Sequence, residues 1–262
     1  MEEIKLLILG IIQGLTEFFP ISSSGHIKIY NAILNVSDPR EFMMLAIVVH
    51  FATALSTMIV YKDKIKHILK GLFFHRSKKS TLFILKLIVS TIPIILVYFF
   101  LQPIIDRVFK DAIILVCFMF ILTGCVLILS GLKTKTSKDI NFFHAFLMGV
   151  VQAVAILPGI SRSGSTISVA LFCNIDKEKA AEFSFLMALA PIIGGVIVEF
   201  SQAGTTINEA NYIGYIIAFF AAFFAGLFAC KYMIKIVQNN NLKYFGYYCI
   251  ILGVSCLVYF LL

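Results

Sequence analysis

The sequence predicts an all-α integral membrane protein with six transmembrane helices, two re-entrant helix hairpins and an inverted-topology internal repeat. Hydrophobic residues make up 60% of the 262 positions and charged residues only 14%, with a mean hydropathy of +0.96. Soluble domains average about 45–50% apolar and about 25% charged residues, so this chain could not keep a soluble surface hydrated. Long apolar stretches recur along the chain, and two shorter ones resemble each other.

Each predicted span follows from the length of its apolar stretch, because a membrane-spanning helix needs about 20 such residues. Six stretches meet that length, at approximately 41–61, 81–101, 111–132, 182–200, 212–236 and 245–262. Ile4–Phe19 and Phe142–Leu157 have only 16 residues each, about 24 Å of helix against an apolar core of about 30 Å. A proline, a turn rich in Ser and Gly and another short apolar run follow each of them. We therefore expect each region to enter the membrane and turn back.

These two short regions are copies of one unit. With a shift of 139 residues and no gap, six of the sixteen positions from Gly10 to Gly25 are identical, among them the polar residues Gln13, Ser22 and Ser24. The chain is then a single membrane domain made of two halves, about 1–138 and about 139–262. Because each half has three spans, the second half is inverted. Inverted repeats with interrupted helices build polar sites near the membrane midplane.

Loop charges predict the orientation of these spans. If the 62–80 loop is cytoplasmic, fifteen Lys and Arg residues fall on its side of the membrane and five on the other. Cytoplasmic loops carry such an excess of cations, so both termini are expected outside. The same bias accounts for the net charge of +8, and we therefore expect no nucleic-acid partner.

Arg162 is the cation that remains deep in an apolar region. An intramembrane Arg costs about 2.5–3.5 kcal/mol on insertion scales and marks a functional site by default. Ser161, Ser163 and Thr166 place hydroxyls around it, and the run opens a short helix whose free N–H groups add positive potential. This combination favours binding of a phosphate oxyanion, and the alternative is a structural ion pair with a carboxylate.

The first hairpin has the complementary groups. Gln13 and Glu17 are four residues apart, on one helix face. A buried Glu17 needs a cation, either Arg162 or a divalent metal, or it binds a proton; alternatively it caps the turn that follows. That turn adds the hydroxyls of Ser22, Ser23 and Ser24 and the imidazole of His26. At least one of the serines is expected to cap the next helix. With Arg162, these groups can bind a phosphate and supply a nucleophile, a base and an acid.

Two motifs carry a family resemblance. Gln13–His26 (QGLTEFFPISSSGH) and Pro158–Thr166 (PGISRSGST) resemble the two signatures of the bacterial undecaprenyl-diphosphate phosphatases, the bacitracin-resistance family. Glu182–Phe185 fits as well, and length and hydropathy agree over essentially the whole chain. The resemblance implies a dimeric, multi-pass hydrolase of the bacterial plasma membrane. Its reaction would convert the C55 prenyl diphosphate to the monophosphate carrier lipid of cell-wall (peptidoglycan) synthesis, at a site that opens to the extracytoplasmic side.

The resemblance also assigns residue roles. By position, the catalytic residues are Glu17, Ser23, His26 and Arg162, and the substrate-binding residues are Gln13, Ser22, Ser24, Ser161, Ser163 and Thr166. A divalent cation, Mg²⁺ or Ca²⁺, is expected to bridge phosphate oxygens and Glu17. Some members have Glu where this chain has Gln13, which puts a two-carboxylate metal site in doubt.

Two questions stay open at the level of sequence. The nucleophile is Ser23, His26 or an activated water. The alternative function is a transporter or flippase for a prenyl-phosphate or other anionic lipid, since inverted repeats with broken helices often serve alternating access.

Overall fold

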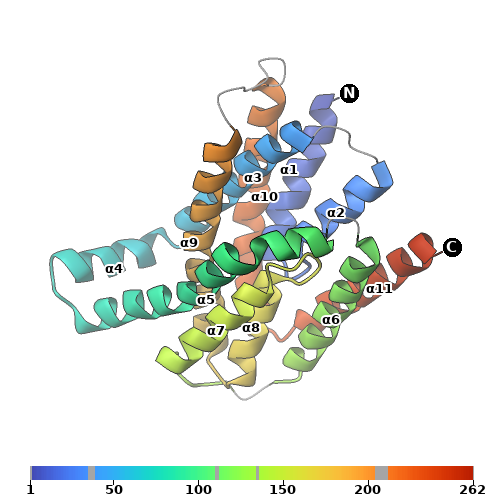
Figure 1. Ribbon diagram of the computed structural model, residues 1–262. Helices are drawn as coiled ribbons and strands as arrows, with labels where there is room; N and C mark the ends of the chain where they lie inside the picture. The colour runs from blue at the N-terminus through green and yellow to red at the C-terminus, as the bar shows by residue number, and fades with distance from the viewer. Residues whose placement is uncertain (1, 35–38, 110–111, 134–135, 204–211, 262) are drawn as a thin grey trace.

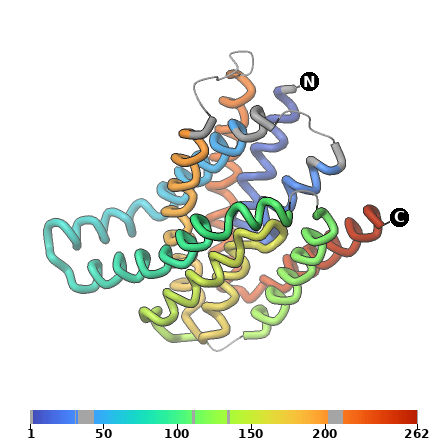
Figure 2. Tube along the Cα trace, viewed as in Figure 1, coloured from blue at the N-terminus to red at the C-terminus, as the bar shows by residue number. Residues whose placement is uncertain are grey.

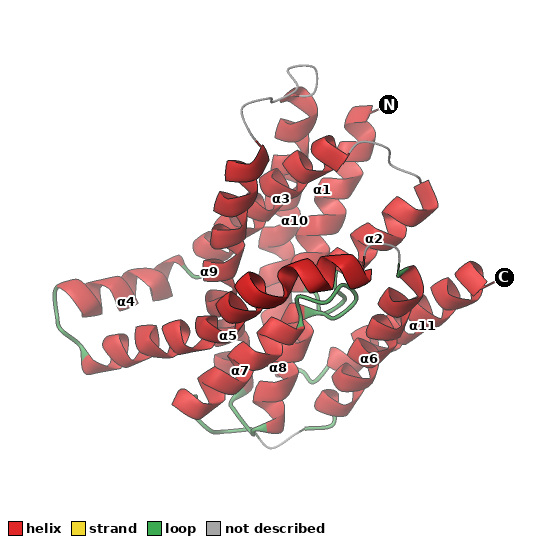
Figure 3. Ribbon diagram, in the orientation of Figure 1, coloured by secondary structure: helices red, strands yellow, loops and turns green. Residues whose placement is uncertain are grey.

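The computed structural model consists of helices joined by turns and loops in the residues that it describes, which are 2–34, 39–109, 112–133, 136–203 and 212–261 (Figure 3). The first helices along the chain are α1 (Glu2–Phe18), α2 (Ser23–Leu34), α3 (Pro39–Val60), α4 (Lys62–Phe73), α5 (Lys78–Phe109) and α6 (Ile113–Gly131). After them come α7 (Phe142–Val154), α8 (Arg162–Phe172), α9 (Lys177–Ala203), α10 (Tyr212–Gln238) and α11 (Leu242–Leu261).

Five described helices are long and apolar enough to cross a membrane: α5, α6, α9, α10 and α11. They correspond to five of the predicted spans. The described part of α3, Met44–Val60, reaches that length only together with α4, from which it is bent by 73°. Large apolar side chains such as Phe99 and Phe224 are exposed, whereas Ser90 and Ser168 are buried. An apolar exterior of this kind is stable against lipid, as in a multi-pass membrane protein.

The segment 62–80 was expected to be a loop and is mostly helical. It contains α4 and the start of α5, and Figure 2 shows this part of the chain extending away from the other helices. Lys64 Nζ donates to Glu182 Oε1 of α9 at 2.8 Å, which fixes the base of this arm. Lys and His lower the hydropathy of a segment, but they do not prevent a helix that buries one face. Two of the twenty Lys and Arg residues that were counted to predict the orientation, Lys110 and Lys135, lie outside the described residues.

The long helices pack through small residues. Gly124 of α6 and Gly246 of α11 face each other so closely that a Cβ on either would lie 2.6–2.7 Å from the other's carbonyl oxygen. Close approach at Gly, Ala and Ser is the usual way in which membrane helices associate. Helices α6 and α11 are antiparallel. Cys117, which precedes Gly124 in α6, packs on Gly253, which follows Gly246 in α11.

Two further helix pairs run in the same chain direction. Gly10 and Gly14 of α1 contact Ala218 and Ala222 of α10 in that order. Helix α5 and the α7 segment also run in parallel: Lys86 donates to the Ile140 carbonyl oxygen, and four residues later in α5 Ser90 packs on Gly149, which follows Ile140. Figure 1 shows α1 beside α10 and α7 beside α5. The short helices α1 and α7 are thus each held by one long helix.

The turns after α1 and α7 meet near the middle of the molecule (Figure 3). Ser22 Oγ accepts from the Gly159 N–H at 3.2 Å, and Ser163 Oγ donates to the Phe19 carbonyl oxygen at 3.5 Å. Gly159 has φ +96°, and a Cβ there would lie 2.6 Å from the Val116 carbonyl oxygen. Only Gly fits that position without strain.

Candidate active site

The two turns use the same side-chain cap, although the capping residues differ in backbone conformation, with φ +65° at Ser22 and −78° at Ser161. Ser22 Oγ accepts from the Gly25 N–H at 3.3 Å, and Ser161 Oγ accepts from the Gly164 N–H at 3.1 Å. Each serine therefore caps the short helix that follows, which confirms the prediction that the cluster contains a capping serine. Thr123 of α6 holds the second turn, because its Oγ1 accepts from the Ser161 N–H at 3.2 Å. The caps aim two helix N-termini, α2 and α8, at the same region.

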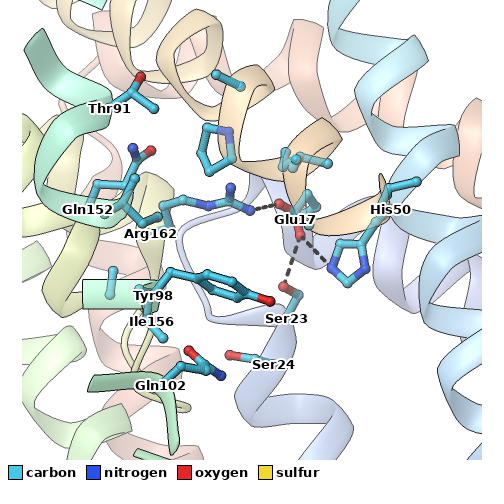
Figure 4. A pocket seen from close by; sticks show the side chains of 18 of the residues that line it. Glu17, Ser23, Ser24, His50, Thr91, Tyr98, Gln102, Gln152, Ile156 and Arg162 are labelled. Carbon is cyan, nitrogen blue, oxygen red and sulfur yellow. Dashed lines mark hydrogen bonds and ion pairs between the residues drawn. The ribbon is translucent and has the colours of Figure 1, made fainter. Parts of the chain in front are cut away.

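Glu17 lies where these two helices meet. Its side chain is buried and forms an ion pair with Arg162 through Oε1. The other oxygen, Oε2, accepts from Gln13 Nε2 at 2.9 Å and from Ser23 Oγ at 3.0 Å (Figure 4). The predicted need of Glu17 for a cation is thus met by Arg162. One carboxylate connects the hydroxyl of one turn to the guanidinium of the other.

A second imidazole, His50 of α3, stands beside this carboxylate. Its Nε2 is 4.0 Å from Glu17 Oε2. Its Nδ1 is 2.8 Å from the Ala46 carbonyl oxygen. Because a carbonyl only accepts, Nδ1 carries a proton and Nε2 is the atom that can take up or release one at the site.

His26 is oriented differently. Its Nδ1 donates to the Ser22 carbonyl oxygen at 2.7 Å, and its Nε2 is 2.7 Å from Tyr248 Oη of α11. The ring also stacks on Tyr248. The structure therefore places His50, and not His26, next to Glu17.

An elongated cavity of about 580 Å³ opens over this site. Six of the sequence-predicted site residues line it: Glu17, Ser22, Ser23, Ser24, Ser161 and Arg162. Apolar side chains from the C-terminal halves of α5 and α9 form much of the remaining wall, including Ile94, Phe99, Pro191, Ile192 and Val196. A cavity with a charged end and apolar walls suits an amphiphile with an anionic head group.

The other predicted residues stand behind the cavity wall. Gln13 holds Glu17, as described above. Thr166 Oγ1 donates to the Arg162 carbonyl oxygen at 2.8 Å and lies 2.7 Å from Ser184 Oγ, so it braces the start of α8. Ser163 joins the two turns through Phe19. These three side chains support the groups that line the cavity.

Sequence reasoning missed several cavity residues: Thr91, Tyr98 and Gln102 of α5, Gln152 of α7 and Glu199 of α9. Helix α5 is apolar on all sides, so its sequence does not indicate which face meets the site. Glu199 lies near the C-terminal end of α9, where a carboxylate is usually solvated, so its place in the sequence does not indicate that it lines the cavity. Gln152 did carry a signal, namely its match with Gln13 in the repeat.

The side chains available as metal ligands limit how a metal ion could be held at this site. In the part of the chain that the structure describes, no group of three or more His, Cys, Asp or Glu side chains could hold one. Glu17 offers a single carboxylate. Mg²⁺ typically keeps several waters and binds one or two carboxylates together with substrate phosphates. The site thus fits a cation that arrives with a phosphate ligand, and not one caged by the protein alone.

Comparison with known proteins gives full-length matches. The family model for the bacitracin resistance protein BacA matches residues 6–255. A protein from Christiangramia forsetii named undecaprenyl-diphosphatase is 39% identical over 260 residues, covering 99% of this chain and 98% of that protein. Proteins with the same name from Bacteroides thetaiotaomicron (38% over 262 residues, 98% and 99% coverage) and Methanococcus vannielii (39% over 257 residues, 97% and 98% coverage) are also similar.

Proposed function

The chain belongs to the bacitracin resistance protein BacA family, and we propose that it is an undecaprenyl-diphosphatase. It hydrolyses undecaprenyl diphosphate to undecaprenyl phosphate and inorganic phosphate, which returns the carrier lipid to cell-wall synthesis. One observation carries the assignment beyond the relatives' names: the buried Glu17–Arg162 pair, with Ser23 bonded to it, closes the polar end of a cavity that is otherwise largely apolar.

Arg162 and the N-termini of α2 and α8 bind the diphosphate. The guanidinium has five N–H groups. One of its nitrogens donates to Glu17, so the N–H groups of the other two nitrogens are available to phosphate oxygens. Phosphoryl transfer needs mainly positioning and charge stabilisation, which a fixed cation and aligned N–H groups supply. Gln13, Ser22, Ser24, Ser161, Ser163 and Thr166 complete the proposed substrate-binding set, directly or by holding the residues that touch the phosphates.

Ser23 is the proposed nucleophile. Its hydroxyl already donates to Glu17 Oε2 at 3.0 Å, so the carboxylate can take that proton while Oγ attacks the terminal phosphorus. The bond to the bridging oxygen breaks, and its electron pair leaves with undecaprenyl phosphate. Glu17 then loses its proton to solvent and takes one from the water that attacks the phosphoserine. The bond from Ser23 Oγ to phosphorus breaks, inorganic phosphate leaves, and Oγ takes the proton back from Glu17. Direct attack by water or by His26 is the alternative.

His26 is the proposed acid/base residue, on the strength of its place in the first motif. Its Nε2 faces Tyr248 here, and catalytic hydrogen bonds often form only when substrate is bound. The proposed Mg²⁺ or Ca²⁺ would be held by Glu17 and the substrate phosphates. When bound, it would neutralise charge on the phosphate oxygens.

We propose six spans, with α3 as the sixth, and two re-entrant hairpins, α1–α2 and α7–α8, in inverted halves 1–138 and 139–262. The packing directions support this arrangement. The contact of α1 with α10 has its counterpart in that of α7 with α5, and both pairs run in the same chain direction. The corresponding helices α6 and α11 are antiparallel, as an inverted repeat requires.

With both termini outside, the C-terminal halves of α5 and α9 lie in the outer half of the membrane. These are the parts that line the cavity, which supports a site that opens to the extracytoplasmic side. A cavity of about 580 Å³ holds the head group and the first part of the chain, so most of the prenyl chain remains among lipids. The homodimer is proposed from the family resemblance, and its mass in detergent tests it.

The decisive experiment is phosphate release from undecaprenyl diphosphate by the detergent-purified protein, with and without EDTA, beside Arg162→Ala. Release by the wild type and none by Arg162→Ala is the expected result, and loss with EDTA would support the cation. The relatives' names favour this enzyme over the transporter alternative. Bound but intact substrate, with no phosphate released, would reverse that preference.

A further inference from the structure

Gln152 of α7 is a buried polar residue for which the catalytic scheme has no role. Its side chain is fully buried, and neither its amide nitrogen nor its amide oxygen has a hydrogen-bond partner among the described residues. It nevertheless lines the cavity, beside Arg162 and on the side away from Glu17 (Figure 4). Leaving a buried amide unpaired is costly, so such groups are rare and call for an explanation.

The internal repeat shows how this amide lost its partner. Gln13 occupies the corresponding position in α1, and its Nε2 donates to Glu17 Oε2 at 2.9 Å, one helical turn further on. The shift of 139 residues that aligns Gln13 with Gln152 aligns Glu17 with Ile156. Ile156 also lines the cavity and offers no acceptor. The second copy has thus kept the amide donor and lost the carboxylate.

A neighbouring hydroxyl does not take the place of that carboxylate. Thr91 of α5 lines the same part of the cavity, but its Oγ1 donates to the Leu87 carbonyl oxygen at 2.8 Å. The amide of Gln152 therefore lies beside Arg162 with two free N–H groups (Figure 4). Phosphate oxygens are acceptors, and an amide can donate to them without competing for the positive charge that Arg162 provides.

We propose that Gln152 is a substrate-binding residue whose Nε2 donates to an oxygen of the diphosphate held by Arg162. The diphosphate then draws Arg162 partly away from Glu17, and the amide of Gln152 gains in the complex the acceptor that it lacks in the free protein. This inference deepens the proposed function and rests on it for the identity of the lipid. The recognition of a diphosphate anion can be tested separately.

Gln152→Leu is the decisive variant, because Leu has a similar size and no unpaired polar atoms. Inorganic pyrophosphate is the probe, measured by the thermal shift that it produces and by its inhibition of turnover. We expect Gln152→Leu to weaken pyrophosphate binding and to raise KM about tenfold, as for loss of one hydrogen bond to a charged group. Without ligand, its Tm should equal or exceed that of the wild type, because an unpaired amide has left the interior.

The matched control is Gln238→Leu. Gln238 is exposed at the C-terminal end of α10 and does not line the cavity. Its replacement should leave pyrophosphate binding and KM within about twofold of the wild type, as is usual for surface substitutions. Gln152→Glu should bind pyrophosphate more weakly than Gln152→Leu, because its carboxylate adds a negative charge that repels the pyrophosphate anion.

Two results with Gln152→Leu would overturn the proposal. In one, Gln152→Leu keeps wild-type pyrophosphate affinity and KM. In the other, it loses activity together with a lower Tm while pyrophosphate affinity is intact, which is the behaviour of a structural residue. If the wild type releases no phosphate from undecaprenyl diphosphate, the phosphatase proposal fails. Pyrophosphate binding that Gln152→Leu weakens would still support the subsite, and a wild type that binds no pyrophosphate would refute it.

Discussion

The two hairpins use the same side-chain cap but differ in the chemistry that they carry. Ser22 and Ser161 cap their short helices through the same atoms, to Gly25 and Gly164. Other aligned positions have diverged: Glu17 aligns with Ile156, Ser23 with Arg162 and His26 with Ser165. The first hairpin has the carboxylate and the proposed nucleophile, and the second has the cation.

In the proposed repeat, this division makes one site out of two related units. Each copy contributes a helix N-terminus, and the Ser22–Gly159 and Ser163–Phe19 hydrogen bonds lock the two turns together. The Glu17–Arg162 pair exists only across the two copies. A single hairpin would leave either a carboxylate or a guanidinium uncompensated in the membrane, where an unpaired charge is costly. Stability and chemistry therefore both depend on the same pairing.

The largest effect should come from removing the charge that distinguishes the first copy. Glu17→Gln keeps the size and one acceptor but loses the base, so we expect turnover to fall by about 10³–10⁴. Phosphate release from undecaprenyl diphosphate measures it. A Tm close to that of the wild type shows that the loss is chemical, and activity near normal would remove Glu17 from the site.

Ser23→Ala tests whether the first copy supplies the nucleophile. We expect kcat to fall by about 10³ or more, since loss of the covalent nucleophile of a hydrolase costs up to about 10⁶. The rate is measured at saturating substrate, and Ser24→Ala is the matched control, with a smaller loss. A residual rate of more than a few per cent of wild type would transfer the role to water or His26.

His26→Gln tests the acid/base role, which depends on a ring that faces Tyr248 in the free protein. We expect kcat to fall by about 10², whereas Tyr248→Phe, which frees Nε2, should retain most of the activity. His50→Gln belongs in the same experiment, because His50 Nε2 is 4.0 Å from Glu17. A larger loss from His50→Gln than from His26→Gln would assign the acid/base role to His50.

Ile156→Glu makes the second copy resemble the first. Ile156 lies in the turn after α7 and lines the same cavity as Gln152 and Arg162. A carboxylate there would compete with phosphate for both residues. We expect KM to rise about tenfold or more, since one charge-assisted hydrogen bond is worth that much. Ile156→Val controls for the loss of apolar volume, and an unchanged KM for Ile156→Glu would mean that the diphosphate does not approach α7.

The smallest effect concerns the two capping serines. Ser22 Oγ accepts from two N–H groups, Gly25 and Gly159, whereas Ser161 Oγ accepts from Gly164. Ser22→Ala should therefore destabilise the protein by about 1–2 kcal/mol, and Ser161→Ala by about 1 kcal/mol or less. Thermal unfolding in detergent measures both. Equal values would mean that the bond between the turns adds nothing to the cap.

Much of the site could be predicted because its signals are local. The capping serines, the i, i+4 pair of Gln13 and Glu17 and the cation at the start of α8 all follow from spacing within short segments. A buried charge needs a countercharge, so the pairing of Glu17 with Arg162 was among the predicted alternatives. The apolar composition likewise determined the membrane class and the approximate position of the spans.

The tertiary structure decided everything that depends on the rotation of one helix against another. The face of α5 that lines the cavity has no marker in its sequence, because a helix that is apolar on all sides shows no amphipathic pattern. Rotation also put His50 beside Glu17 and turned His26 to Tyr248. The isolation of Gln152 depends on what surrounds it, which only packing determines. Sequence spacing fixes contacts within one helix, whereas contacts between helices require the assembled fold.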